Sequence, residues 1–399
     1  MLIDVLLFCS LVGLTSCTVF LGLLIAASRH FRRHKDAGAV PGDLPRVTVL
    51  KPVHGLEPEL ERSLESFFLQ DYPSYEIVFG CRHEADPALR IVEVLRARHP
   101  EIPVKVVLSG EPDRPNAKVC SLEKMVQAAQ TDYLIISDSD VHVASTYLRE
   151  VVAPLLDQKV GLVTCLYRGV ATGGLWSRLE ALGMSVELTS GVIIANMLEG
   201  MKFALGPTMA TRRDVLAAIG GVGVLGDYHA DDYVLGEKVD EAGFKVVLSQ
   251  HIVEHIVLNR RFLDSFRHQV RWTKSTRFSR PKGHVGAGLT FATPFGIVAG
   301  ICCIALGAPI WAAALLAWAM LSRMIQAIVA GYDTVGDRES LVYCWLYPAR
   351  DFLGFILWCA SFMGSTFFWR GERYRFQAGG RIICDVPRAG SELSEATGD

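Results

Sequence analysis

The stretch YLIISDSD at residues 133–140 places two aspartates directly behind a run of apolar residues. A short apolar run that ends in a polar turn is typical of a buried strand. In an open α/β sheet, ligands bind at the carboxyl ends of the strands, which is where Asp138 and Asp140 fall. Two carboxylates at such an edge can hold a Mg or Mn ion against a diphosphate, because hard cations prefer oxygen ligands. The triplet also fits a solvated turn, so the surrounding sequence has to distinguish a metal site from a turn.

Short β-branched runs and amphipathic helical segments alternate on both sides of this stretch, which predicts a mostly parallel sheet flanked by helices. The predicted strands lie at residues 46–52, 75–81, 104–110, 133–140, 160–166 and 245–251. The predicted helices, in which apolar residues recur at three- and four-residue spacing, lie at residues 58–70, 87–98 and 117–130. Together these elements indicate a catalytic α/β domain at residues 40–282.

A second acidic pair, Asp231 and Asp232, follows a glycine-rich stretch at residues 220–226 and precedes an amphipathic helix. An acidic residue at a helix N-terminus is stabilised by the helix dipole, which would explain one of the two. The other could act as a general base toward a hydroxyl if the fold brings it near Asp138.

A basic and aromatic stretch, RHQVRWTK at residues 267–274, lies just before an apolar C-terminal region. A basic helix at a membrane surface would account for it. Arg271 and Trp272 could instead grip a diphosphate and line an acceptor pocket. Weaker phosphate-binding candidates, each of which could also be an ordinary surface residue, are a strand-end lysine and an N-x-K turn: Lys51, Asn116 and Lys118.

The mean hydropathy of +0.28 and a charged fraction of only 21% are too apolar for an ordinary soluble domain of 399 residues. Residues 1–28 are expected to form an N-terminal transmembrane anchor, because the uncharged stretch covers the roughly 20 residues that span a bilayer. A basic cluster follows this stretch, whereas a cleavable signal peptide would have it in front. The same cluster predicts a catalytic domain on the cytoplasmic face, which is the inner membrane in a bacterium.

Residues 285–370 are expected to form a C-terminal transmembrane or re-entrant region. It contains two candidate spans that make a hairpin, then an interrupted apolar region that is predicted to be a half-inserted segment followed by a span: residues 286–306, 309–330 and 341–369. One span after the hairpin would place the C-terminus outside, whereas the arginines that follow favour a cytoplasmic end. Residues 371–399 are expected to be a polar tail.

The order of these motifs resembles the ceramide glucosyltransferase family, glycosyltransferase family 21, together with its bacterial hopanoid-associated relatives. The matching stretches are VLKPVHGLEPEL, QDYPSYEIVFG, PNAKVCSLEKM, DSD, ADDYVLGEKV, RWTK and WRGERYRFQAGG. The resemblance implies a GT-A fold with a divalent cation at the diphosphate site. It also implies inverting transfer of glucose or N-acetylglucosamine from a UDP-sugar to a lipid hydroxyl, on a ceramide or a hopanoid.

The resemblance further implies roles for single residues. Asp138 and Asp140 match the metal and diphosphate site, and Asp232 matches the catalytic base. The positions that look like donor contacts, the last three from a (Q/R)xxRW motif, are Lys51, Asn116, Lys118, His268, Arg271 and Trp272. His83 stands where the family's first aspartate is expected, which leaves Glu84 or Asp86 to contact the nucleotide.

Two other functions stay open at this point. A processive polysaccharide synthase would share these motifs but needs more membrane helices for its channel. A non-catalytic membrane protein that binds lipid or nucleotide would fit the two histidine departures. A nucleic-acid partner is disfavoured by the net charge of −2, and the ten cysteines lack the CxxC spacing of a metal or redox site.

Overall fold

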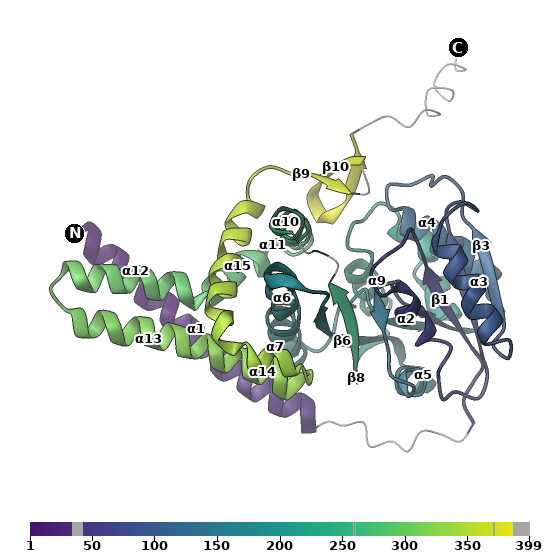
Figure 1. The fold of residues 1–399 in the computed structure, drawn as a ribbon, viewed down its shortest axis with the longest axis horizontal. Coiled ribbons are helices and arrows are strands. Elements are labelled where there is room, and N and C mark those ends of the chain that lie inside the picture. Colours follow the sequence, from purple (N-terminus) through teal and green to yellow (C-terminus); the bar gives the residue numbers. More distant parts are fainter. Residues whose placement is uncertain (34–42, 258, 260, 370–371, 386–399) are drawn as a thin grey trace, which may run out of the picture.

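The computed structural model describes residues 1–33, 43–257, 259, 261–369 and 372–385. An α/β domain forms one end of the molecule, and a bundle of long helices projects from it (Figure 1). The N-terminus lies at the far end of this bundle (Figure 1).

The α/β domain is built on an eight-stranded sheet with the order β3-β2-β1-β4-β7-β6-β8-β5. Its strands are β1 (Val47–Pro52), β2 (Tyr75–Cys81), β3 (Val104–Leu108), β4 (Tyr133–Ile136), β5 (Val141–His142), β6 (Val160–Ala171), β7 (Met209–Arg212) and β8 (Lys245–Val257). The first four strands are mutually parallel, as are β6 and β8, so the predicted mostly parallel sheet is confirmed.

Strand β7 is absent from the sequence prediction, and it runs antiparallel between β4 and β6. Its short sequence MATR ends in an arginine, so it lacks an apolar strand pattern. Arg212 is nevertheless buried because its guanidinium donates to the carbonyl oxygens of Leu155 and Val160 at 3.1 and 2.6 Å.

Six helices of this domain pack around the sheet: α2 (Leu60–Glu65), α3 (Ala88–Arg98), α4 (Ala117–Ala128), α5 (Tyr147–Val152), α8 (Arg213–Ala218) and α9 (Asp231–Glu241). The helix predicted at 58–70 is shorter than expected. It stops before Ser66, whose hydroxyl donates to Ser63 O at 2.6 Å and accepts from Val143 N at 3.2 Å, tying this turn to the segment after β5.

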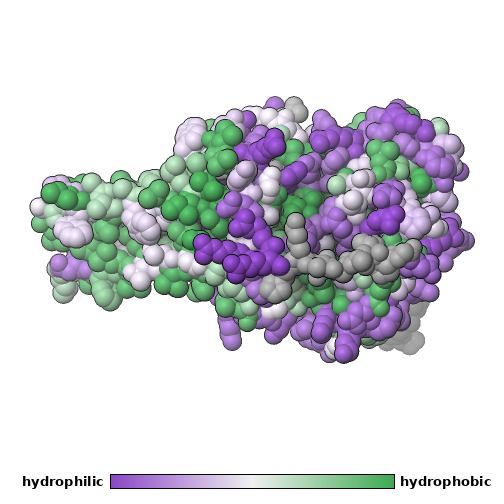
Figure 2. All heavy atoms as spheres, turned by 90° about the horizontal axis from the view of Figure 1, so that it is seen from below, coloured by the Kyte–Doolittle hydropathy of each residue, from purple (hydrophilic) through white to green (hydrophobic). Residues whose placement is uncertain are grey.

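The projecting bundle consists of α1 (Leu2–Arg33), α12 (Ala292–Ala305) and α13 (Pro309–Gln326), whose surface is largely hydrophobic (Figures 1 and 2). Among the described residues, α1 and the run Pro309–Thr334 are long and apolar enough to cross a membrane. Helix α12 joins α11 (Pro281–Ala287) and a short turn at a bend of 49°, and this pair would make a further span. The expected apolar helices at both ends of the chain are therefore present.

A third apolar run, Gly174–Glu199, was not predicted as a span. It comprises α6 (Gly174–Gly183), the π-helical turn η2 (Met184–Leu188) and α7 (Thr189–Glu199). In the most apolar 18-residue stretch of this run, 61% is buried inside the protein, whereas the corresponding share in α1 is 33%. In Figure 1 this run crosses the inner end of the bundle, between the bundle and the sheet. It therefore packs mainly against protein.

The region at 341–369 differs from its prediction. Helix α15 (Tyr347–Ser361) has 15 residues, fewer than the roughly 20 that a span requires. It is followed by β9 (Thr366–Trp369), which pairs with β10 (Glu372–Phe376), and β10 pairs with β11 (Ile382–Cys384). Within the described residues, no helix of this region passes the length and composition test for a span, and strands β10 and β11 lie within the range expected to be a polar tail. Residues 386–399 of that range lie outside the described part.

The three-stranded sheet β9–β11 lies on the α/β domain. The backbone N–H of Ile382 donates to Asp227 O at 2.8 Å, just before the second acidic pair. The end of β11 is therefore on the catalytic side of the bundle, which agrees with the arginine-rich sequence rather than with a final span.

Helix α9 is pressed against the loop before β7 at one glycine. A Cβ on Gly236 would lie 2.3 Å from Phe203 Cα and 2.4 Å from Ala204 N, which are backbone atoms. We expect Gly236→Ala to lower the free energy of unfolding by about 1–3 kcal/mol, because the loop would have to shift. Gly286→Ala, where nothing lies within 4 Å, is the matched control. Equal thermal unfolding midpoints for the two variants would contradict this packing.

Candidate active site

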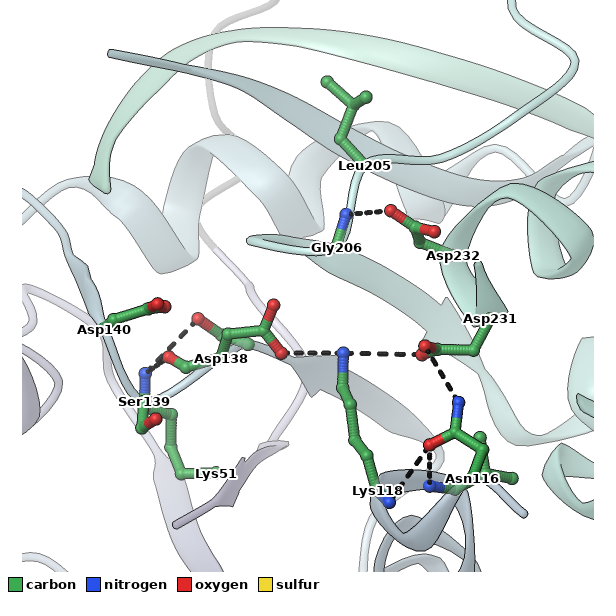
Figure 3. Close-up of polar contacts among 12 residues, drawn as sticks. Lys51, Asn116, Lys118, Asp138, Ser139, Asp140, Leu205, Gly206, Asp231 and Asp232 are labelled. Carbon is green, nitrogen blue, oxygen red and sulfur yellow. Dashed lines mark hydrogen bonds and ion pairs between the residues drawn. The ribbon is translucent and has the colours of Figure 1, made fainter. Parts of the chain in front are cut away.

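The aspartates after β4 lie at the carboxyl end of the sheet (Figure 3). Asp138 Oδ1 lies 2.7 Å from Lys118 Nζ, and Asp140 Oδ2 lies 3.5 Å from His255 Nδ1 on β8. Asp140 Oδ1 is buried without a hydrogen-bond partner among the described residues. Burial, and after it the charge of Asp138, raise the pKa of Asp140. This edge of the sheet therefore holds a buried carboxylate with one oxygen that accepts no hydrogen bond from the described residues.

Lys51 is fully buried at the end of β1, so it is not a surface lysine. Its ammonium group donates to Asp138 O, and it lies 3.8 Å from the ring centroid of Phe67. Burial lowers the pKa of Lys51 to about 7, although Asp138 and Asp140 oppose this effect. Lys51 thus fixes the backbone of the DSD turn by donating to the carbonyl oxygen of Asp138 from the buried side of the turn.

Lys118 joins the two acidic motifs. Its ammonium lies 2.7 Å from Asp138 Oδ1 and 3.4 Å from Asp231 Oδ2 (Figure 3). Burial by itself would lower the pKa of Lys118, but Asp138 and then Asp231 outweigh it and raise the pKa. This lysine is therefore charged at neutral pH.

Asn116 is the N-cap of α4. Its Oδ1 accepts from Lys118 N at 3.1 Å and Val119 N at 3.4 Å, which satisfies free amides of the first helical turn. Its Nδ2 donates to Tyr228 O at 2.8 Å and Asp231 Oδ1 at 3.3 Å. Asn116 thereby fixes the loop of the second acidic pair against α4.

Asp232 faces Asp138 across Gly206 (Figure 3). Its Oδ2 accepts from Gly206 N at 2.7 Å and its Oδ1 from Tyr233 N at 2.8 Å. A Cβ on Gly206 would lie 3.2 Å from Asp138 Oδ2 and 3.2 Å from Asp232 Oδ2. Burial, and after it the charge of Asp231, raise the pKa of Asp232. A buried carboxylate with a raised pKa therefore stands opposite the DSD motif.

The basic stretch lies on α10 (Phe262–Ser279). Trp272 contacts two histidine rings, with centroids 4.5 Å away for His268 and 6.1 Å away for His255, which in turn contacts Asp140. His268 Nδ1 lies 2.8 Å from Oε1 of Glu180, a buried residue of α6. His268 is thus placed behind Trp272, against α6.

His229 is a member of the site that the sequence prediction omits. Its ring centroid lies 5.3 Å from Phe367, 5.3 Å from Trp369 and 5.4 Å from Phe376, all on the C-terminal sheet. Burial, and after it the charge of Arg271, lower the pKa of His229 to about 3. The C-terminal sheet and Arg271 therefore meet at the loop that leads into the second acidic pair.

The structure also shows the surroundings of His83, which stands where the family's first aspartate is expected, and of the nearby Asp86. His83 is exposed and lies 3.4 Å from Glu111 Oε1. Asp86 has a buried side chain that accepts from Gly55 N at 2.9 Å and from Ala88 N at 2.9 Å. Asp86 therefore ties the loop after β1 to the loop after β2.

A divalent cation at the DSD motif would need ligands from the substrate or from water in addition to the two aspartates. The described residues contain no group of three or more His, Cys, Asp or Glu side chains that could hold a metal ion by themselves. Mg²⁺ is usually bound through one or two carboxylates together with substrate phosphates and water. Asp138 and Asp140, whose Oδ1 accepts no hydrogen bond from the described residues, match that pattern, with a diphosphate as the remaining ligand.

An α/β sheet with an acidic pair at the end of a central strand, a facing carboxylate and neighbouring basic groups defines the GT-A class of glycosyltransferases. Residues 6–382 match Glycosyl transferase family 21, and the chain belongs to this family. It is a ceramide glucosyltransferase-like hexosyltransferase.

Ceramide glucosyltransferase 1 of Caenorhabditis elegans is 25% identical over 357 residues, which is 88% of this chain and 76% of that protein. The ceramide glucosyltransferase of Komagataella phaffii is 38% identical over a local match of 110 residues, 27% of this chain and 22% of that protein. The mannosyltransferase of Pyrobaculum calidifontis, solved with GDP-Man and Mn²⁺, aligns with a TM-score of 0.51 at 18% identity. That alignment covers 88% of this chain and 97% of the mannosyltransferase, and it supports the fold alone.

Proposed function

We propose that this protein transfers one hexose from a UDP-sugar to the hydroxyl of a neutral membrane lipid on the cytoplasmic face of the membrane. The observation that carries the proposal is the pairing of Asp138 and Asp232 across Gly206, in a domain attached to an apolar bundle. Glucose and ceramide are the first candidate pair because the named relatives are ceramide glucosyltransferases. Glucose or N-acetylglucosamine with a hopanoid is the second pair.

On the donor side, Asp138 and Asp140 would hold a Mg or Mn ion, which supplies positive charge for the leaving diphosphate. The mannosyltransferase with a similar fold was solved with Mn²⁺, so Mn²⁺ is the first ion to test here. Lys118 stays charged beside Asp138, so it can stabilise the negative charge that develops on the leaving group. Arg271 and Trp272 complete the donor side from α10.

On the acceptor side, Asp232 takes the proton of the lipid hydroxyl. The hydroxyl oxygen forms a bond to the anomeric carbon while the bond from that carbon to the UDP oxygen breaks, so the configuration inverts in one step. The amides of Gly206 and Tyr233 hold the carboxylate in a fixed orientation. A positioned general base contributes about 10²–10⁴-fold to a rate.

This role gives the reaction an acid limb. Asp232 must be ionised to accept a proton, and burial raises its pKa, so the rate should fall on acidification at a pH above the ordinary aspartate pKa of about 3.9. The maximal rate at saturating donor and lipid, measured from pH 8 downward at constant metal concentration, checks this. A rate that is still constant at about pH 4 would contradict a base with a raised pKa.

The lipid content of cells tests the function without purified protein. Cells that lack the gene should lose one hexosylated neutral lipid and accumulate its unglycosylated precursor, as seen by lipid mass spectrometry. An unchanged lipid profile, or loss of a long polysaccharide instead, would contradict the proposal.

A further inference from the structure

Charged side chains are buried where the bundle meets the α/β domain. Arg323 near the end of α13 is 1% exposed, and Arg350 and Asp351 on α15 are 5% and 3% exposed. Arg350 Nη2 donates to Glu187 Oε2 at 2.9 Å, and Arg323 Nη1 lies 3.5 Å from Asp351 Oδ1. These four residues, here named the buried charge cluster, contain two cations and two carboxylates and are therefore charge-balanced.

Many polar atoms at this cluster have no hydrogen-bond partner among the described residues. They are Arg323 Nε and Nη2, Arg350 Nε and Nη1, Glu187 Oε1, and Oε1 of the neighbouring Gln326. Gln326 lies one turn after Arg323, and its Nε2 donates to Ser190 Oγ on α7 at 3.1 Å. Buried polar atoms in native proteins are nearly always satisfied by protein, water or a ligand. Unsatisfied donors and acceptors gathered in one place therefore point to a polar ligand.

The backbone around the cluster is unusual as well. Glu187 lies inside the π-helical turn η2, and a second π-helical segment, η5 (Ala327–Thr334), begins directly after Gln326. Such turns are rare and are frequent at functional sites. A Cβ on Gly354 of α15 would lie 3.2 Å from Glu187 Oε1 and 3.7 Å from Arg350 Nη1. The same Cβ would lie 2.9 Å from Phe291 Cε1, so glycine at this position lets the Phe291 ring pack beside two of the unsatisfied atoms.

The cluster is also linked to the acidic site through the α6–α7 run. Helices α13, α15 and the α6–α7 run meet at the inner end of the bundle (Figure 1). About two turns before Glu187 on this run, Glu180 contacts His268, which packs on Trp272 beside the acidic site. The α6–α7 run therefore connects the cluster to the side chains beside the acidic site.

We propose that the buried charge cluster binds the amide- and hydroxyl-bearing backbone of a neutral acceptor lipid. This inference rests on the proposed function, in which a lipid is the acceptor. It adds the place where the polar backbone of that lipid binds. The equal numbers of cationic and acidic side chains favour an uncharged ligand, because a phosphate would add negative charge to a buried site. An amide with a hydroxyl offers an acceptor to the arginine N–H groups and donors to the oxygens of Glu187 and Gln326.

The test measures binding of a tritiated short-chain ceramide to the full-length protein in detergent, without nucleotide sugar. Diacylglycerol and phosphatidic acid of the same chain length are the comparison probes. Arg350→Lys keeps a cation for Glu187 but removes the unsatisfied guanidinium donors, and Gly354→Ala adds a methyl group next to Glu187. We expect each variant to weaken ceramide binding roughly tenfold, with UDP binding unchanged.

Gly191→Ala on α7, where nothing lies within 4 Å, is the matched control and should bind ceramide like the wild type. Wild-type ceramide affinity in both test variants, or tighter binding of phosphatidic acid than of ceramide, would overturn the inference. Arg350-dependent ceramide binding by a protein that transfers no sugar would refute the proposed function and uphold the inference. Sugar transfer with an unchanged KM for lipid in both variants would uphold the proposed function and refute the inference about the buried charge cluster.

Discussion

Asp232→Asn is expected to reduce sugar transfer by about 10²–10⁴-fold, because an amide cannot take the acceptor proton. UDP binding should persist, since Asp138 and Lys118 are unchanged. The amide also cannot accept from both Gly206 N and Tyr233 N, so we expect a stability loss of about 1–3 kcal/mol. Initial rates with labelled UDP-glucose, together with the thermal unfolding midpoint, separate the two effects.

Asp240→Asn is the control, because Asp240 is an exposed carboxylate on the same helix. It should transfer sugar at the wild-type rate. Asp232→Asn with more than half of wild-type activity would remove Asp232 as the base.

Asp138→Asn is expected to cost at least about 100-fold in rate, since metal and charge stabilisation of a leaving diphosphate is worth several kcal/mol. Chelation of divalent cations from the wild-type protein should have a similar effect, which added Mn²⁺ reverses. UDP affinity, measured by calorimetry with and without Mn²⁺, should depend on the metal in the wild type and lose that dependence in the variant.

Asp132→Asn serves as the matched control, because Asp132 is exposed at the opposite end of the same strand. Its metal dependence should equal that of the wild type. Metal-independent UDP binding and transfer by the wild-type protein would show that the DSD motif does not hold a cation for the donor.

The parallel part of the sheet could be predicted because each of its strands has a short apolar run with its own turn signals. The same reasoning placed Asp138 at a strand end, since that position follows from the strand alone. It could not find β7 or the C-terminal sheet, because the short MATR and the arginine-rich ERYRF are strands only through their partners.

Burial explains the remaining differences between the site predicted from the sequence and the site in the structure. The sequence cannot distinguish a lysine on the surface from Lys51, which is enclosed behind the DSD turn, or an N-x-K turn from an N-cap that binds Asp231. A glycine such as Gly206 gives no sign of a site in the sequence, yet its backbone lies between the carboxylates of Asp138 and Asp232. His229 and the aromatic residues that enclose it are more than 130 residues apart, so only the fold brings them together.

The most direct test is transfer by the purified full-length protein, with ceramide and hopanoid acceptors offered together with labelled UDP-glucose or UDP-N-acetylglucosamine. The account predicts a lipid that carries a single hexose with inverted anomeric configuration, formed by the wild-type protein and lost in Asp138→Asn and Asp232→Asn. A water-soluble product that lengthens with time, or a glycolipid formed equally by both variants, would contradict it.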